Sequence, residues 1–207
     1  SVMDLEYGGV RSGKYALASM MRGKRIGTID LSDNLTKTDL SIALVASMKA
    51  SIAAGNLIRA LNPKALVLLD RGYTPAGELF DACINAEIPV FTWNSSHKNN
   101  SLILKRYDSR NRDAHPSSLS KETWSKIQQS ELNEEIQQLV FGELESCYSS
   151  GVWYGEVGTQ LNKAPASKAE IFDQLNLKSN VRTVGIFPHI FWDATFCWGK
   201  DLFENYE

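Results

Sequence analysis

The stretch Ala65-Leu66-Val67-Leu68-Leu69-Asp70-Arg71-Gly72-Tyr73-Thr74-Pro75 decides the fold class of this chain. Its first five residues are apolar without alternation, which predicts a short strand buried on both faces. The polar residues after them predict a loop at the carboxyl end of that strand. A helical pattern over 76–86 and an apolar run over 88–93 come next. This order predicts two parallel strands joined by a right-handed crossover through a helix.

The segments on either side extend the same pattern. Apolar residues at helical spacing predict a long helix over 38–61. Residues 24–31 and 102–107 each read as a short strand, and 168–175 as a short helix. A helix or helix pair is predicted over 120–148, with the buried stripe Trp124, Ile127, Leu132, Ile136, Leu139, Val140 and Leu144. The predicted fold is therefore α/β, with a Rossmann-like parallel sheet flanked by helices.

Composition and charge narrow the classes of function. The 22 Lys and Arg residues nearly balance 24 Asp and Glu, so the charge pattern does not favour nucleic-acid binding. Three scattered cysteines fit reduced thiols better than a disulfide framework or a zinc site. No uninterrupted apolar run reaches the roughly 20 residues of a membrane span, and no secretory signal is visible. We therefore expect a cytoplasmic protein.

A glycine-rich segment precedes the first helical pattern. Residues 8–14 spell G-x-x-x-x-G-K, but Tyr15 stands where a phosphate-binding P-loop needs Ser or Thr. We interpret the segment as a Gly-rich turn before a helix. Arg11 and Lys14 are then candidates for binding an anion at the start of that helix.

Two groups of polar residues follow predicted strands and are candidates for chemistry. Asp70, Arg71 and Tyr73 lie in the loop after the first strand, where a carboxylate can orient or deprotonate a hydroxyl. Trp93 and Asn94 end the next strand and suit a sugar ring and its hydroxyls. Structural alternatives stay open for both: a surface ion pair for the first group, and a core tryptophan for the second.

A third group lies near the end of the chain. The apolar run 184–187 stops at Pro188, and His189, Trp192 and Asp193 follow within five residues. Proline cannot donate to a sheet, so we expect a strand to end there and the three side chains to lie in a loop at its carboxyl end. The region from 176 to 182 reads as an interdomain linker.

Three stretches resemble capsule and surface polysaccharide biosynthesis proteins, which are glycosyltransferases of the two-Rossmann-domain (GT-B) type. They are Leu69-Asp70-Arg71-Gly72-Tyr73-Thr74-Pro75-Ala76-Gly77-Glu78, Ile88-Pro89-Val90-Phe91-Thr92-Trp93 and Gly185-Ile186-Phe187-Pro188-His189-Ile190-Phe191-Trp192-Asp193-Ala194-Thr195-Phe196. The resemblance implies an acceptor-side domain over 1–177. It also implies that 178–207 is a linker and the first strand and loop of a truncated nucleotide-sugar domain, so this chain is expected to be inactive alone.

The resemblance also implies a reaction: transfer of a sugar from a nucleotide-sugar donor to a surface polysaccharide. Asp70 would be the base, with Arg71, Tyr73 and Trp93 shaping the acceptor site. His189 and Asp193 would lie near the donor phosphates. No metal or resident cofactor is expected, because the nucleotide sugar is a co-substrate. Contact with membrane-bound glycan machinery would place the protein at the inner membrane surface.

Two alternatives remain open from the sequence. The chain could be a Rossmann-like module that binds a nucleotide or a glycan without catalysis, or a sugar epimerase of the GT-B fold. The stretch 184–207 carries many apolar side chains, which are costly to expose. We expect it to dock on its own N-terminal domain or to pair with a second copy as a homodimer.

Overall fold

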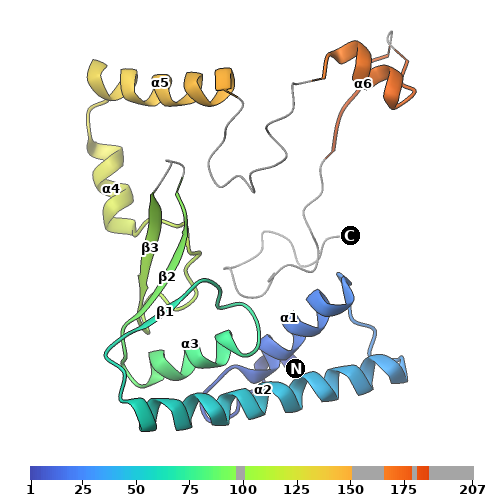
Figure 1. Ribbon diagram of the computed structural model, residues 1–207, viewed down its shortest axis with the longest axis vertical. Helices are drawn as coiled ribbons and strands as arrows, with labels where there is room; N and C mark the ends of the chain where they lie inside the picture. The colour runs from blue at the N-terminus through green and yellow to red at the C-terminus, as the bar shows by residue number, and fades with distance from the viewer. Residues whose placement is uncertain (97–100, 151–165, 179–180, 187–207) are drawn as a thin grey trace. The chain divides into compact units, whose positions relative to one another are not determined.

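The computed structural model describes residues 1–96, 101–150, 166–178 and 181–186 (Figure 1). It confirms the α/β class: a three-stranded mixed sheet is flanked by helices. The chain divides into two compact units. Among the described residues, the first unit contains 1–94 and 102–118, and the second contains 95–96, 101 and the described part of 119–186.

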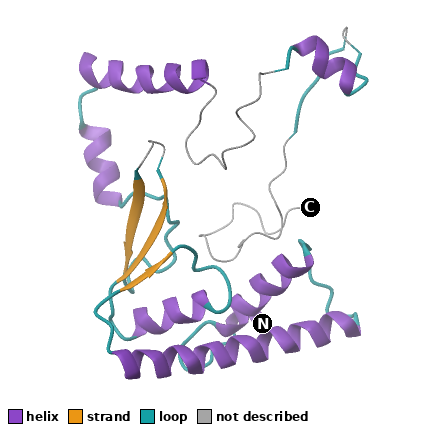
Figure 2. Cartoon of the chain, viewed as in Figure 1, coloured by secondary structure: helices purple, strands orange, loops and turns teal. Residues whose placement is uncertain are grey.

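The sheet confirms the predicted strand–helix–strand segment (Figure 2). Its strands lie in the order β1-β2-β3, and β1 runs parallel to β2 with Leu68 opposite Thr92. Helix α3 connects these two strands. The strand predicted over 102–107 is confirmed as β3, and it lies next to β2. The bounds are β1 Leu66–Leu68, α3 Ala76–Asn85, β2 Val90–Ser95 and β3 Leu102–Tyr107.

Two helices precede the sheet in the chain. After the 3-10 turn η1 (Val2–Asp4), α1 spans Ser12–Lys24 and α2 spans Asn34–Leu61. The predicted long helix is confirmed and begins four residues earlier than expected, because the Asp33 carboxylate accepts from two amides of the first turn.

The strand predicted over 24–31 is wrong. Helix α1 continues to Lys24 and ends at Arg25, which adopts a left-handed conformation with φ of 56°. Such a residue closes a helix and turns the chain aside. The residues between Arg25 and Asn34 form turns and irregular backbone.

The core lies on one face of the sheet. Phe80 and Ile84 of α3 pack against Val90 and Tyr107, and all four are buried. Helices α1 and α2 form a second cluster through Leu17, Met20 and Leu40.

The described residues leave the opposite face of the sheet uncovered, so among them the strand predicted to be buried on both faces is covered on one. Val67 is 62% exposed and Leu69 56%, and the β3 residues Leu102 and Leu104 are exposed as well. Because side chains alternate across a strand, the covered residues Leu66 and Leu68 face α3 while these four face away.

The second unit contains the helices α4 (Lys121–Gln129), α5 (Glu134–Ser150) and α6 (Lys168–Gln174). The Ser120 hydroxyl accepts from the Thr123 amide, which confirms the predicted start of α4. The predicted buried stripe is wrong, since every one of its residues is exposed: Trp124, Ile127, Leu132, Ile136, Leu139, Val140 and Leu144. The described residues of this unit supply no second layer to cover them.

The predicted strand near the end of the chain is absent from the part that is described. Residues 182–186 have no regular secondary structure, and Val184 is 76% and Ile186 84% exposed. Residues 187–207, and with them the docking or pairing predicted for this end, lie outside the described residues. The predicted second domain therefore stays a prediction.

Helix α2 has the length and composition of a membrane-spanning helix, with a mean hydropathy of 1.4 over its most apolar window. Core helices of soluble proteins meet the same criterion. One side of α2 is buried, where Leu40, Ser47, Ser51 and Ala54 lie. On other sides Leu35 and Ile42 are exposed.

Candidate functional site

The candidate site lies at the carboxyl edge of β1 and β2. These strands are parallel and in register at Leu68 and Thr92. Asp70 and Asn94, each two residues further along, therefore come to the same edge, together with Trp93. In α/β sheets this edge is where ligands bind. The structure thus brings together predicted site residues that lie more than twenty positions apart in the chain.

Asp70 is held in place by its own loop and by α1. Its Oδ1 accepts the Gly72 amide at 2.8 Å, and its Oδ2 lies 3.6 Å from Nη1 of Arg22. The side chain is 37% exposed, so a solute can reach it. The Arg22 guanidinium also lies 4.3 Å from the centre of the Tyr73 ring. Arg22 therefore links the carboxylate to the phenol ring of the same loop.

Arg71 has a structural position instead of a surface one. It is 1% exposed, and its guanidinium lies 5.0 Å from the Phe80 ring centre and 4.7 Å from that of Tyr107. It donates to the backbone oxygens of Arg112 and Ala114 at 2.9 and 2.7 Å. Arg71 therefore holds the segment after β3 against the core. The surface ion pair considered for this group is found at Asp70, and its partner is Arg22.

Tyr73 is also largely buried, at 9% exposure. It packs with Val10, Tyr15 and Ala18, and these contacts hold the loop in place. The amide of Thr74, its neighbour, donates to the Ser19 hydroxyl at 2.9 Å. The loop after β1 is thus anchored on α1.

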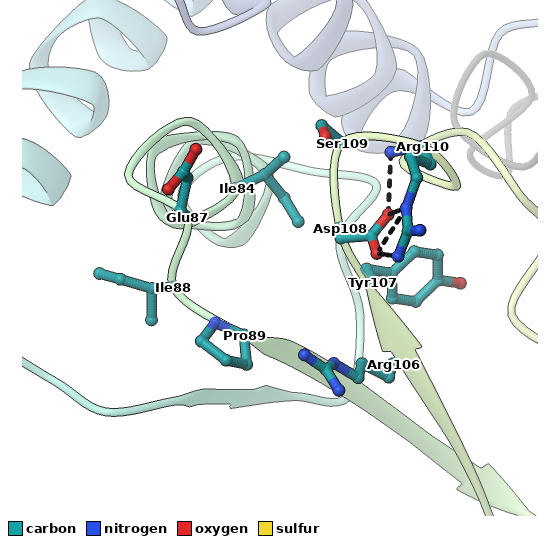
Figure 3. A pocket seen from close by; sticks show the side chains of 9 residues that line it. All are labelled: Ile84, Glu87, Ile88, Pro89, Arg106, Tyr107, Asp108, Ser109 and Arg110. Atoms are coloured by element: carbon teal, nitrogen blue, oxygen red, sulfur yellow. Dashed lines mark hydrogen bonds and ion pairs between the residues drawn. The ribbon is translucent and has the colours of Figure 1, made fainter.

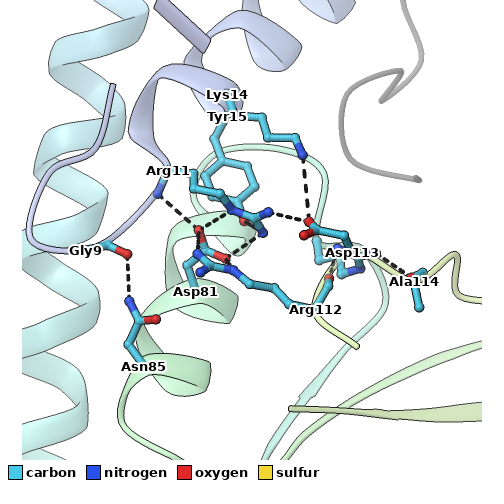
Figure 4. A network of polar contacts seen from close by, with 10 residues as sticks. Gly9, Arg11, Lys14, Tyr15, Asp81, Asn85, Arg112, Asp113 and Ala114 are labelled. Carbon is cyan, nitrogen blue, oxygen red and sulfur yellow. Dashed lines mark hydrogen bonds and ion pairs between the residues drawn. The ribbon is translucent and has the colours of Figure 1, made fainter. Parts of the chain in front are cut away.

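The turn before α1 confirms the Gly-rich interpretation. Gly8 and Gly9 have φ of 61° and 77°, which suits glycine, and the helix begins at Ser12. The anion at this helix start is the protein's own Asp81 (Figure 4). The Arg11 amide and Nε donate to Asp81 Oδ2 at 3.1 and 3.0 Å, and Nη2 donates to Oδ1 at 2.9 Å. Arg11, predicted to contact substrate, is therefore engaged inside the fold.

Asp81 is the centre of this network, which we call the Asp81 network. Nε of Arg112 donates to Asp81 Oδ1 at 2.9 Å, and Asp113 pairs with Arg11. Burial alone would raise the pKa of Asp81, but the hydrogen bonds from Arg11 and Arg112 outweigh it and lower that pKa. The carboxylate is therefore ionised and fully paired, which is a structural role.

Glu78 is a second buried carboxylate, one turn before Asp81. Its Oε1 accepts from the hydroxyls of Ser47 and Thr74 at 2.5 and 2.7 Å. Its Oε2 is buried with no hydrogen-bond partner among the described residues. Burial raises the pKa of Glu78, and the two hydroxyls offset part of that rise.

We predict that the stability of the Glu78→Gln variant falls less with rising pH than the stability of the unaltered protein. Because the folded-state pKa lies above its ordinary value of 4.5, the native state keeps a proton that the unfolded state has released. Stability therefore falls as pH rises from 4.5 through the folded-state pKa. Denaturant unfolding of both proteins at several pH values measures this, and the variant should have the flatter curve. Parallel curves above pH 4.5 would contradict the prediction.

Asp81 gives a separate pH window for comparison. Its folded-state pKa lies below the ordinary 3.8, so its stabilisation is present above 3.8 and is lost as pH falls through the folded-state pKa. Asp81 therefore makes stability depend on pH below 3.8, whereas Glu78 makes it depend on pH above 4.5.

Asp81 and Glu78 were not predicted as functional or structural centres from the sequence. The signal available was the spacing of Glu78 and Asp81, three residues apart in a helix whose neighbours Phe80 and Ile84 are core residues.

A separate pocket lies away from the carboxyl edge, where the chain enters β2 (Figure 3). Its volume is about 220 Å³, and Pro89, Tyr107 and the paired Asp108 and Arg110 line it. It contains none of the predicted site residues.

The remaining predictions cannot be placed. His189, Trp192 and Asp193 lie outside the described residues. Within the described part of the chain, no group of His, Cys, Asp or Glu is arranged to hold a metal ion. Comparisons with protein-family models, with curated proteins and with solved structures give no match.

Proposed function

We propose that this chain is the acceptor-side part of a glycosyltransferase of the GT-B type, which moves a sugar from a nucleotide-sugar donor to a surface polysaccharide. The observation that carries the proposal is the position of Asp70. It is a reachable carboxylate at the carboxyl end of a parallel strand, oriented by the Gly72 amide and by Arg22. The resemblance in the stretches after β1, in β2 and after 184 supports the same function.

In this proposal Asp70 accepts the proton of the acceptor hydroxyl as that oxygen attacks the sugar. The Gly72 amide fixes one carboxylate oxygen, and Arg22 lies near the other, so the carboxylate is held in one orientation toward an acceptor hydroxyl. Trp93 offers an apolar face to a sugar ring, and Asn94 offers hydrogen bonds to its hydroxyls. Both belong to the edge that carries Asp70. His189 and Asp193 are proposed near the donor phosphates.

A non-catalytic glycan- or nucleotide-binding module is the second candidate. Specific observations favour it: Arg71, Tyr73 and Arg11, which were expected to contact a substrate, are engaged inside the fold. A module of this kind would bind a sugar at Trp93 and Asn94 and would need no base at position 70.

We predict that Asp70→Asn lowers turnover of nucleotide sugars by the full-length protein about a hundredfold, as expected for loss of a general base. The amide keeps the acceptor for the Gly72 amide, so the loop should keep its shape. Turnover is measured as sugar transfer or donor hydrolysis over a panel of nucleotide sugars.

Asp39→Asn is the matched control. Asp39 is 34% exposed and pairs with Lys24 of α1, but it lies on α2 and not at the carboxyl edge. It should leave turnover unchanged. Undiminished turnover in Asp70→Asn would remove Asp70 from the role of base. Binding of sugar without transfer by the unaltered protein would favour the module.

A further inference from the structure

The pocket where the chain enters β2 is lined by apolar and charged side chains together (Figure 3). Its volume of about 220 Å³ corresponds to that of about seven water molecules at ~30 Å³ each. The apolar walls are Ile84 at the end of α3 and the following Ile88 and Pro89, and the end of β3 and the turn after it supply the rest. Ligand pockets commonly combine such walls with a few polar groups that fix the orientation of the ligand. The pocket therefore has room for a small molecule.

Two of the charged groups in the lining satisfy each other. Nη2 of Arg110 donates to Oδ2 of Asp108 at 2.6 Å, and Nε donates to the same oxygen at 3.2 Å. The Arg110 amide donates to the other oxygen, Oδ1, at 2.8 Å. These bonds lower the pKa of Asp108 to about 2, so the carboxylate is ionised and paired at neutral pH. This pair therefore adds no net charge to the pocket.

Arg106 brings an unpaired cation to the pocket. It lies on β3 and is exposed, and its guanidinium has no hydrogen bond or ion pair with any described residue. A guanidinium presents N–H donors in a planar fork that matches the two oxygens of a carboxylate. Arg106 is therefore available to bind a carboxylate of a ligand.

Glu87 brings an unpaired anion, at a position that folding alone disfavours. It follows α3 with φ of 57°, in the left-handed region where the chain more often places glycine after a helix. It also adds a negative charge beside the helix C-terminus, which is the negative end of the helix dipole. Its side chain pairs neither with Arg106 nor with any other described residue. Unfavourable local features of this kind concentrate at functional sites, so a ligand explains Glu87 better than stability does.

We propose that this pocket binds a small zwitterion with an apolar side chain, such as a free α-amino acid. Arg106 donates to the carboxylate of the ligand, and Glu87 accepts from its ammonium group. The side chain of the ligand lies against Ile84, Ile88 and Pro89. A ligand with only one of the two charges would leave the other charge of the pocket unpaired and would lose one set of charge-assisted hydrogen bonds. Because the pocket lies away from the carboxyl edge, this binding is independent of the glycosyltransferase function.

The test is a titration of the protein with L-valine, followed by amide chemical shifts. Isovalerate has the same carbon skeleton without the ammonium group, and isobutylamine lacks the carboxylate. We expect L-valine to bind at least about tenfold more tightly than either compound, the difference expected for one charge-assisted interaction. The largest shifts should lie at the residues that line the pocket.

Two variants separate the two ends of the ligand. Arg106→Gln should weaken L-valine binding about tenfold and remove its advantage over isobutylamine. Glu87→Gln should weaken it by about the same factor and remove its advantage over isovalerate. A general loss of structure would not affect one end alone. Both positions are exposed, and Glu87→Gln removes a negative charge from a helix C-terminus, so both variants should fold.

Arg25→Gln is the matched control. Arg25 is exposed, and its side chain, like that of Arg106, has no partner among the described residues, but it lies at the end of α1 and outside the pocket. This variant should bind L-valine as the unaltered protein does. Absence of L-valine binding, equal binding of the three compounds, or an equal loss of binding in Arg25→Gln would overturn the proposal.

Discussion

Asp81→Asn should destabilise the first unit by about 3–5 kcal/mol, the loss expected when one partner of a buried ion pair is neutralised. Asparagine has nearly the shape of aspartate, so packing is preserved and only the charge is lost. Arg11 and Arg112 would then remain 15% and 20% exposed around a neutral group. Denaturant unfolding, followed by circular dichroism, measures the difference.

Asp108→Asn is the control for this variant. Asp108 also pairs with an arginine, Arg110, but that arginine is 87% exposed and solvent screens the pair. Such exposed pairs contribute little to stability, so this variant should unfold almost as the unaltered protein does. If both variants lose the same stability, burial is not what makes Asp81 important, and the role assigned to the Asp81 network is wrong.

Gly77→Ala should cost about 3 kcal/mol, at the upper end for overpacking a core. A methyl group at Gly77 would lie 2.3 Å from both Cδ1 and Cε1 of Tyr15. Tyr15 is 1% exposed and its hydroxyl accepts from Arg11, so the ring cannot move without disturbing the Asp81 network. Thermal and denaturant unfolding both report the loss.

Gly23→Ala is the control in the same unit, and we expect it not to destabilise the protein. Gly23 lies in α1, and no heavy atom lies within 4 Å of the position a methyl group would take. Alanine is favoured over glycine in helices by up to about 1 kcal/mol, so this variant should be at least as stable as the parent. A stable Gly77→Ala protein would show that α3 is packed less tightly on α1 than described.

The sheet shows which structural features can be predicted from the sequence and which cannot. The strand–loop–helix–strand pattern from Leu66 to Ser95 follows from short-range periodicity, and it was predicted. Whether a strand is covered on one face or two depends on layers far away in the chain. Val67 and Leu69 are as apolar as buried residues but are exposed, because none of the described helices of the first unit covers them.

Some residues of the candidate site could likewise be predicted from the sequence, and others could not. Asp70, Trp93 and Asn94 were predicted because strand ends can be read from the sequence, and parallel pairing brings them to one edge. Arg71 follows Asp70 directly and carries a full charge, yet it turns inward between Phe80 and Tyr107. Its partners are the backbone oxygens of Arg112 and Ala114, about forty residues later, and nothing local indicates them.

The long separations within the Asp81 network have a consequence for synthesis. Arg11 contacts Asp81 and Asp113, which follow it by 70 and 102 residues. A ribosome adds roughly 5–20 residues per second, so the start of α1 is made several seconds before either carboxylate exists. The start of α1 is thus completed by residues that are translated later in the same unit, so the ion pairs of Arg11 cannot form until those residues have been made.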